Sequence, residues 1–234
     1  MYGYGYRYNS GLVVSAGGGA PFNTKSLLFD GVGDYVSIGT TLDLGINCTI
    51  SLWIKRGRNN ASETYLGSIA NSYGWLSYIT TGNIIYFKVG TAQYSFSSSP
   101  ISTILNDTTN WINITWQRSG NILELFLNGV SMLSRTLSAS SVNTTLDTIG
   151  TNASGGGGFL GNIDEVAAWN TNTIIPSDIY NLGTPNDLTS LNPISWYRMG
   201  DNDIFPTITD NGSGGNDGTM TNMDAGDIVS DVPL

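Results

Sequence analysis

The side chains that could perform acid–base chemistry are few, and their spacing argues against hydrolysis. The chain has no histidine, which excludes the commonest general base and the serine–histidine and cysteine–histidine dyads. Asp164 and Glu165 form the nearest acidic pair, but neighbouring side chains of a strand point to opposite faces of a sheet. Glu124 stands between two leucines. Because glycoside hydrolysis needs two carboxyl groups on one bond, about 5–5.5 Å apart in retaining enzymes, we predict that the protein is not an enzyme.

Aromatic residues offer a different chemistry, because flat rings can stack on sugar rings. Tyr73, Trp75 and Tyr78 follow one another within a predicted strand, and we take them as the candidate carbohydrate-binding residues. The alternative is that they are ordinary core or sheet-face residues, as large aromatic side chains often are. Trp53 and Trp116 lie in strongly alternating segments, and we predict that both belong to the core.

Aspartates mark several turns. Asp30 and Asp34 flank Gly31 and Gly33, and aspartate in such a turn bonds its own backbone. The alternative is that these carboxylates and the nearby carbonyl groups supply oxygen ligands to a cation. A second acidic group is assigned to turn chemistry; it contains Asp201, Asp203, Asp210 and Asp217.

Composition limits the classes of protein to which the chain can belong. Its 234 residues are only 12% charged, with a formal net charge of −9. Long amphipathic helices would need more charged residues on their outer faces, whereas many Gly, Ser, Thr and Asn residues are typical of short strands joined by turns. The negative charge argues against binding to nucleic acid or to anionic membranes. A single all-β domain is therefore the expected fold class.

Alternation of apolar and polar residues predicts antiparallel strands along most of the chain. The Asn128-Gly129 pair predicts a type I′ hairpin, because both positions need positive φ. Only residues 176–183 show a convincing helix, with proline at the start and glycine at the end. Residues 26–36 are expected to form a strand, a tight turn and a second strand. Further predicted strands cover residues 48–55, 73–79, 84–89, 94–96, 111–118, 122–127, 130–137 and 159–169.

Four segments in order resemble laminin-G-like domains of the concanavalin A-like lectin/glucanase superfamily. They are Phe29-Asp30-Gly31 with Asp34-Tyr35-Val36, then Thr49 to Ile54, Leu125 to Val130, and Phe159 to Val166. The resemblance covers about residues 26–183 and implies an antiparallel jelly-roll β-sandwich that recognises surfaces or sugars. It also implies that Asp30, Asp34 and Asp164 meet around a structural calcium ion. The Glu-x-Asp-x-Glu strand of the family's retaining glucanases is absent.

The C-terminal residues resemble a segment that normally precedes the Phe-Asp-Gly hairpin in this family. They contain Trp196-Tyr197-Arg198-Met199-Gly200-Asp201 and then Thr209 to Met220. We predict that residues 194–234 complete the sandwich, so that residues 21–234 form a single domain. The alternatives are a truncated second copy or a strand donated to a neighbouring subunit.

Residues 1–20 are rich in tyrosine and glycine, with Tyr2, Tyr4, Tyr6 and Tyr8 spaced two apart and no secretion signal. A flexible leader is one interpretation; an arm that anchors the protein to a particle is the other, because tyrosine gives large contact area at low entropic cost. The composition is similar to that of bacteriophage virion proteins carrying this fold.

We therefore predict a non-enzymatic protein on the virion surface, a capsid decoration or fibre subunit. Its expected partners are other virion proteins, further copies of itself and cell-surface glycans. The competing hypotheses are a freestanding carbohydrate-binding adhesin module and, disfavoured by the missing carboxylates, a glycan-active enzyme.

Overall fold

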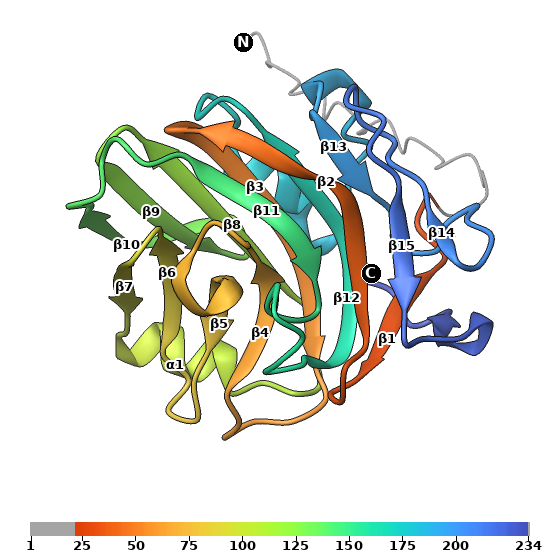
Figure 1. Ribbon diagram of the computed structural model, residues 1–234. Helices are drawn as coiled ribbons and strands as arrows, with labels where there is room; N and C mark the ends of the chain where they lie inside the picture. The colour runs from red at the N-terminus through yellow and green to blue at the C-terminus, as the bar shows by residue number, and fades with distance from the viewer. Residues whose placement is uncertain (1–21, 234) are drawn as a thin grey trace, which may run out of the picture.

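Two antiparallel sheets of eight strands each pack face to face in the computed structural model, which describes residues 22–233 (Figure 1). This arrangement confirms the predicted antiparallel jelly-roll sandwich. The predicted leader, with Tyr2, Tyr4, Tyr6 and Tyr8, lies outside the described residues. The first sheet is ordered β10 (Val130–Thr136), β9 (Ile122–Leu127), β8 (Ile112–Ser119), β3 (Asn47–Arg56), β12 (Leu160–Trp169), β1 (Ser26–Asp30) and β16 (Ile228–Val229), and β13 (Ser195–Tyr197) also pairs with β12.

The second sheet contains the other eight strands and carries Trp75 and Tyr78, two of the predicted carbohydrate-binding residues. Its order is β14 (Thr207–Ile208), β15 (Gly218–Thr221), β2 (Tyr35–Gly45), β11 (Thr144–Ile149), β4 (Glu63–Gly67), β5 (Trp75–Ile79), β6 (Ile85–Val89) and β7 (Ala92–Phe96).

Side-chain alternation explains how the strands form a core and an outer surface. In β3, Ile50, Leu52 and Ile54 are buried in the main core between the sheets. Trp53 and Lys55 alternate with these residues and therefore point to the outer face of the first sheet. The predicted hairpin is also present, since Asn128 and Gly129 have φ of +52° and +73° and connect β9 to β10.

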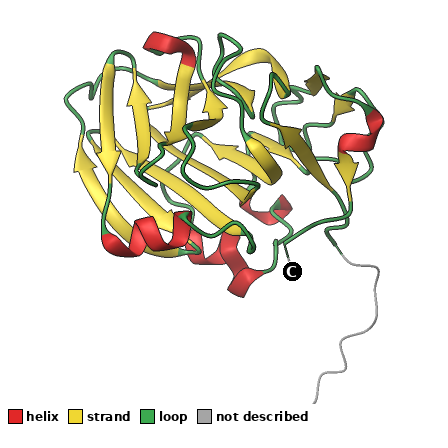
Figure 2. Ribbon diagram, turned by 90° about the horizontal axis from the view of Figure 1, so that it is seen from below, coloured by secondary structure: helices red, strands yellow, loops and turns green. Residues whose placement is uncertain are grey.

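The helices lie outside the two sheets (Figure 2), and α2 (Pro176–Tyr180) packs on the outer face of the first sheet, where Tyr180 stacks on Trp53. The helix α2 is shorter than predicted because Asn181 and Leu182 adopt left-handed backbone conformations. The first, α1 (Ser99–Leu105), was missed: its seven residues give little periodicity, although Ser98 caps its N-terminus. Neither α-helix in residues 22–233 has the length and hydropathy needed to cross a membrane. The short 3₁₀ turns are η1 (Ser72–Gly74), η2 (Asn181–Gly183), η3 (Thr189–Leu191) and η4 (Ala225–Asp227).

The C-terminal segment adds strands to both sheets, as predicted. In the first sheet, β1 pairs with the first half of β12, and β13 pairs with the second half. In the second sheet, β15 pairs with β2 through four consecutive positions. Figure 1 shows these blue strands beside the orange-red strands from the start of the chain. The C-terminal segment therefore completes the sandwich of its own chain.

Candidate functional site

Four aromatic rings form a continuous row on the outer face of the second sheet; with Lys88 we call them the aromatic cluster. Tyr78 and Tyr86 face each other across β5 and β6, with ring centroids 4.9 Å apart and planes within 10°. Trp75 packs its ring edge-on against Tyr78 at 4.1 Å, and Tyr73 stacks on Trp75 at 5.9 Å. The three residues predicted to bind carbohydrate, Tyr73, Trp75 and Tyr78, thus lie together.

Lys88, on β6, contacts two rings of the aromatic cluster, those of Tyr73 and Trp75. Its Nζ lies 4.2 Å from the centre of the Trp75 ring and 4.7 Å from that of Tyr73. Only 2% of Lys88 is exposed, and desolvation lowers the pKa of its ammonium group. Burial, with a smaller contribution from Tyr86, raises the pKa of Tyr78 to about 12. Cation–π attraction is strongest where water is excluded, so Lys88 fixes the orientation of Tyr73 and Trp75.

Tyr73 is the exposed end of the row. It exposes 76% of its surface, and its backbone has a φ of +64°, a conformation that costs a bulky residue about 1–3 kcal/mol. Asn71 holds the surrounding turn in place. Its amide nitrogen donates to the carbonyl oxygens of Trp75 and Lys88, each at 3.0 Å, and its Oδ1 accepts from the Gly90 amide at 2.6 Å.

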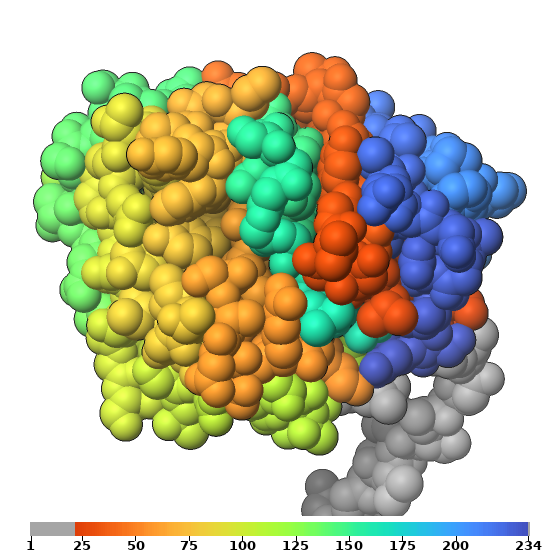
Figure 3. All heavy atoms as spheres, turned by 60° about the horizontal axis from the view of Figure 1, so that its bottom comes forward, coloured from red at the N-terminus to blue at the C-terminus, as the bar shows by residue number. Residues whose placement is uncertain are grey.

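A glycine-rich loop, residues 151–158, borders the aromatic cluster. The Ala153 amide donates to the Gly74 carbonyl at 2.7 Å. Gly74 permits this approach, because a Cβ there would lie 3.0 Å from the amide nitrogens of Ala153 and Ser154. Figure 3 shows the teal segment that contains this loop beside the orange and yellow surface of β4 to β7. The loop therefore adds exposed backbone and Ser154 as polar groups next to the rings.

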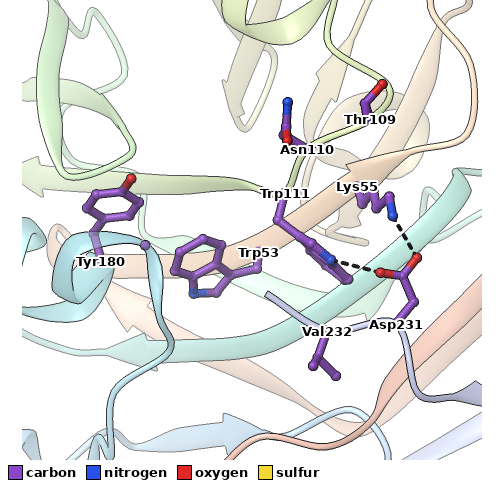
Figure 4. A pocket seen from close by; sticks show the side chains of 9 residues that line it. Trp53, Lys55, Thr109, Asn110, Trp111, Tyr180, Asp231 and Val232 are labelled. Atoms are coloured by element: carbon purple, nitrogen blue, oxygen red, sulfur yellow. Dashed lines mark hydrogen bonds and ion pairs between the residues drawn. The ribbon is translucent and has the colours of Figure 1, made fainter. Parts of the chain in front are cut away.

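A pocket on the outer face of the first sheet was not predicted. Its volume is about 340 Å³, and Figure 4 shows its aromatic and charged side chains. Trp53 stacks on Tyr180 of α2 at 5.5 Å. Our assignment of Trp53 to the core was therefore only partly correct: Trp53 is 2% exposed, but its ring lies under α2 rather than between the sheets. Trp116, by contrast, lies in the main core.

The two predicted turn aspartates bond to their own turn. The Val32 amide donates to Oδ1 of Asp30 at 2.6 Å, and the Asp30 amide donates to Oδ2 of Asp34 at 2.9 Å. Burial raises the pKa of Asp34. Asp164 lies further along β12 and accepts from Asn23 at 2.7 Å. No three His, Cys, Asp or Glu side chains within residues 22–233 are grouped so that they could hold a metal ion, and calcium binding stays a prediction.

Asp164 and Glu165 do not lie in a regular strand. The pairing of β12 with β3 shifts register between Asp164 and Ala167, and Glu165 has a φ of +48°. Both are buried, at 0% and 3% exposure. The regular alternation predicted for this strand is thus interrupted by a bulge, as happens where one strand carries an extra residue.

Glu165 ties β12 to the C-terminal segment. Its carboxylate accepts from Nε1 of Trp196 at 2.5 Å and from Nε of Arg198 at 3.3 Å. Arg198 also pairs with Asp201 at 2.8 Å. Burial raises the pKa of Glu165 to about 7, and burial together with the Glu165 charge raises that of Asp164 well above its usual range. These carboxylates have structural partners inside the fold.

Comparison with known proteins places the fold. A model of the concanavalin A-like lectin/glucanases superfamily (Laminin_G_3) matches residues 30–176, whereas the comparison with curated proteins gives no match. A putative carbohydrate-binding protein from Bacteroides ovatus is similar in structure, with a TM-score of 0.65 and 17% identity over 91% of this chain. This chain spans 61% of that protein's length. A heptameric SAP-like pentraxin from Limulus polyphemus has a TM-score of 0.53 and 15% identity, over 68% of this chain and 82% of the pentraxin. Since the family model matches more than half of the 234 residues, the chain belongs to the concanavalin A-like lectin/glucanases superfamily.

Proposed function

We propose that the protein binds carbohydrate, and that the aromatic cluster is a site at which it does so. The observation that carries this proposal is Tyr73, which is 76% exposed in a strained backbone conformation. Strain of this kind is retained where the surrounding structure enforces it, and it concentrates at functional sites. The superfamily and the similarity to a putative carbohydrate-binding protein support the same conclusion.

The geometry suits a sugar ring. Trp75 and Lys88 contact Tyr73 on one side, and the high exposure of Tyr73 leaves the rest of its ring open to solvent. A sugar can stack its C–H face on an aromatic ring, while its hydroxyl groups bond to the neighbouring loop. Ser154 and the exposed glycines of residues 155–157 supply such polar groups.

Replacing Tyr73 by alanine tests the proposal. The wild type and Tyr73→Ala are compared on an array of neutral and acidic oligosaccharides, and each glycan that binds is then titrated by calorimetry. We expect the dissociation constant to rise about tenfold or more, since an aromatic contact of about 1.4 kcal/mol corresponds to that factor. Ile69→Ala is the matched control, because Ile69 is a nearby apolar side chain with 70% exposure. Equal affinities for wild type and Tyr73→Ala would refute the site.

We also propose that the protein does not hydrolyse the glycans it binds. Asp164 and Glu165 are buried and engaged by Asn23, Trp196 and Arg198, and Glu124 bonds to Ser131 on the neighbouring strand. Incubation with β-glucans, alginates and sialosides tests this proposal. Turnover that disappears in Glu124→Gln or Glu165→Gln would overturn it.

Attachment of this domain to a virion remains a proposal that rests on composition. The tyrosines at positions 2, 4, 6 and 8 would supply contact area to another virion protein. A chain lacking residues 1–19 should lose particle association while its melting temperature stays unchanged. An unchanged association would favour a freestanding carbohydrate-binding module.

A further inference from the structure

The pocket on the outer face of the first sheet combines ring faces with a fixed pair of charges; we call it the Trp53 pocket. Its wall is made by β3, by the residues before β8, by α2 and by the C-terminal residues, which carry Trp53, Lys55, Trp111, Tyr180 and Asp231 (Figure 4). A volume of about 340 Å³ is at the lower end for ligand pockets. The occupant must therefore be small, about the size of a single ring with its substituents.

Three aromatic side chains line the pocket. Trp53 and Tyr180 stack at 5.5 Å with planes 24° apart, and Figure 4 shows the Trp111 ring between Trp53 and Asp231. Trp53 is buried, whereas Trp111 and Tyr180 are half-buried. These two rings have surface to offer a ligand.

The polar groups of the Trp53 pocket form hydrogen bonds with one another. Nε1 of Trp111 donates to Oδ1 of Asp231 at 3.2 Å, and Nζ of Lys55 donates to Oδ2 at 2.8 Å. Side-chain exposure is 28% for Lys55 and 45% for Asp231. A carboxylate accepts about four hydrogen bonds and an ammonium donates three. Each group therefore keeps hydrogen-bonding capacity for a ligand without moving.

We propose that the Trp53 pocket binds a neutral pyranose ring and is a second carbohydrate site. An acceptor and a donor side by side fit adjacent hydroxyl groups of a sugar, and the neighbouring Thr109 and Asn110 extend this polar rim. An anionic sugar is disfavoured, because Asp231 lies at the rim and the chain carries a formal net charge of −9. A purely apolar ligand is disfavoured as well, because it would strip water from the Lys55–Asp231 pair without replacing hydrogen bonds.

The two sites are on opposite faces of the sandwich. Trp53 and Lys55 alternate with the core residues of β3 in the first sheet, whereas Tyr78 and Tyr86 belong to the second sheet. One molecule would thus be able to hold two glycan chains at once. This inference extends the proposed carbohydrate binding, and independent variants separate the two sites.

The experiment compares full-length wild type, Tyr73→Ala and Trp111→Ala on the same array of neutral and acidic oligosaccharides. We expect at least one neutral glycan that Tyr73→Ala retains and that Trp111→Ala binds tenfold or more weakly. Asp231→Asn preserves the shape of the side chain and should weaken binding of the same glycan about fivefold. Leu182→Ala is the control, because Leu182 lies beside the pocket and is 96% exposed.

The outcomes are distinct. A neutral glycan that depends on both Trp111 and Asp231 supports the Trp53 pocket, even where Tyr73→Ala changes nothing and the aromatic cluster fails. If every glycan depends on Tyr73 and none on Trp111, the pocket proposal is overturned and the proposed function stands. If no glycan binds the wild type, both proposals are overturned. Melting curves of each variant show whether a loss of binding is caused by unfolding. If Trp111→Ala is unfolded, the affinity of Asp231→Asn decides whether the Trp53 pocket binds the glycan.

Discussion

Protein stability should fall as the pH rises from about 5 to about 7.5, because of the buried Asp164–Glu165 pair. Burial raises the pKa of Glu165 from 4.5 to about 7, so the folded state holds a proton that the unfolded state has released. The stabilisation is fully present below the unfolded pKa and is lost as the pH rises through the folded pKa. The pKa of Asp164 is raised as well, which acts in the same direction.

The magnitude follows from the shift of Glu165 alone. A shift from 4.5 to about 7 corresponds to about 3 kcal/mol in total, of which about 2 kcal/mol is lost between pH 5 and pH 7.5. For a domain of this size, that loss lowers the melting temperature by about 4–8 °C. The chain has no histidine, so no side chain with an ordinary pKa titrates in this range.

Urea unfolding at 25 °C, followed by tryptophan fluorescence across this pH range, measures the effect. Glu165→Gln should reduce the slope, and adding Asp164→Asn should remove most of what remains. Asp178→Asn is the control, because Asp178 is exposed on α2. A free energy of unfolding that stays constant or increases from pH 5 to pH 7.5 would show that the reasoning about this buried pair is wrong.

Three further changes test the packing and the predicted cation. Gly150→Ala should destabilise the fold by about 3 kcal/mol, since φ there is +93° and a Cβ would lie 2.3 Å from Phe29. The control is Gly155→Ala, where φ is also positive but no atom lies within 4 Å of the added Cβ. Chemical unfolding should show a much smaller loss of stability for Gly155→Ala. Arg118→Leu should cost about 3 kcal/mol, because the buried guanidinium group donates to backbone carbonyls between β10 and β11; an unchanged unfolding midpoint would contradict this. If calcium binds, EDTA should lower the melting temperature, Ca²⁺ should restore it, and Asp164→Asn should weaken the response; identical curves with and without EDTA would exclude a stabilising calcium ion.

Local patterns in the sequence predicted most of the sandwich, because strand alternation and turn chemistry act over a few residues. The Asn128-Gly129 hairpin is the clearest case, since few residues other than Asn and Gly accept positive φ at both turn positions. The helix α1 was missed because two turns carry too little periodicity. The bulge at Glu165 was missed because its cause is tertiary: Trp196 and Arg198 bind its carboxylate from 31 and 33 residues away.

The aromatic cluster was within reach of sequence reasoning, and the Trp53 pocket was not. Tyr73, Trp75 and Tyr78 are close in the chain and were singled out as aromatic residues, although a regular strand would place Tyr78 on the face opposite Tyr73 and Trp75. Their rings meet because Tyr73 lies in a turn with positive φ and the pairing of β4 with β5 shifts register. The Trp53 pocket instead joins Trp53, Trp111 and Asp231, and the last two are 120 residues apart. The one local signal was that Trp53 and Lys55 share a strand face, because a lysine on that face marks it as the outer one.

Completion of the fold and formation of the Trp53 pocket depend on the same segment. Without β13 the second half of β12 would lose a pairing partner, because β1 reaches only as far as Ile163; an exposed strand edge of this kind invites pairing with other chains. Beyond β13, the chain runs through β15 and β16, and Asp231 then reaches Lys55 and Trp111. The carboxylate of the pocket is therefore present only when the C-terminal strands have paired with both sheets. The polar half of this site is thus a consequence of how the sandwich closes.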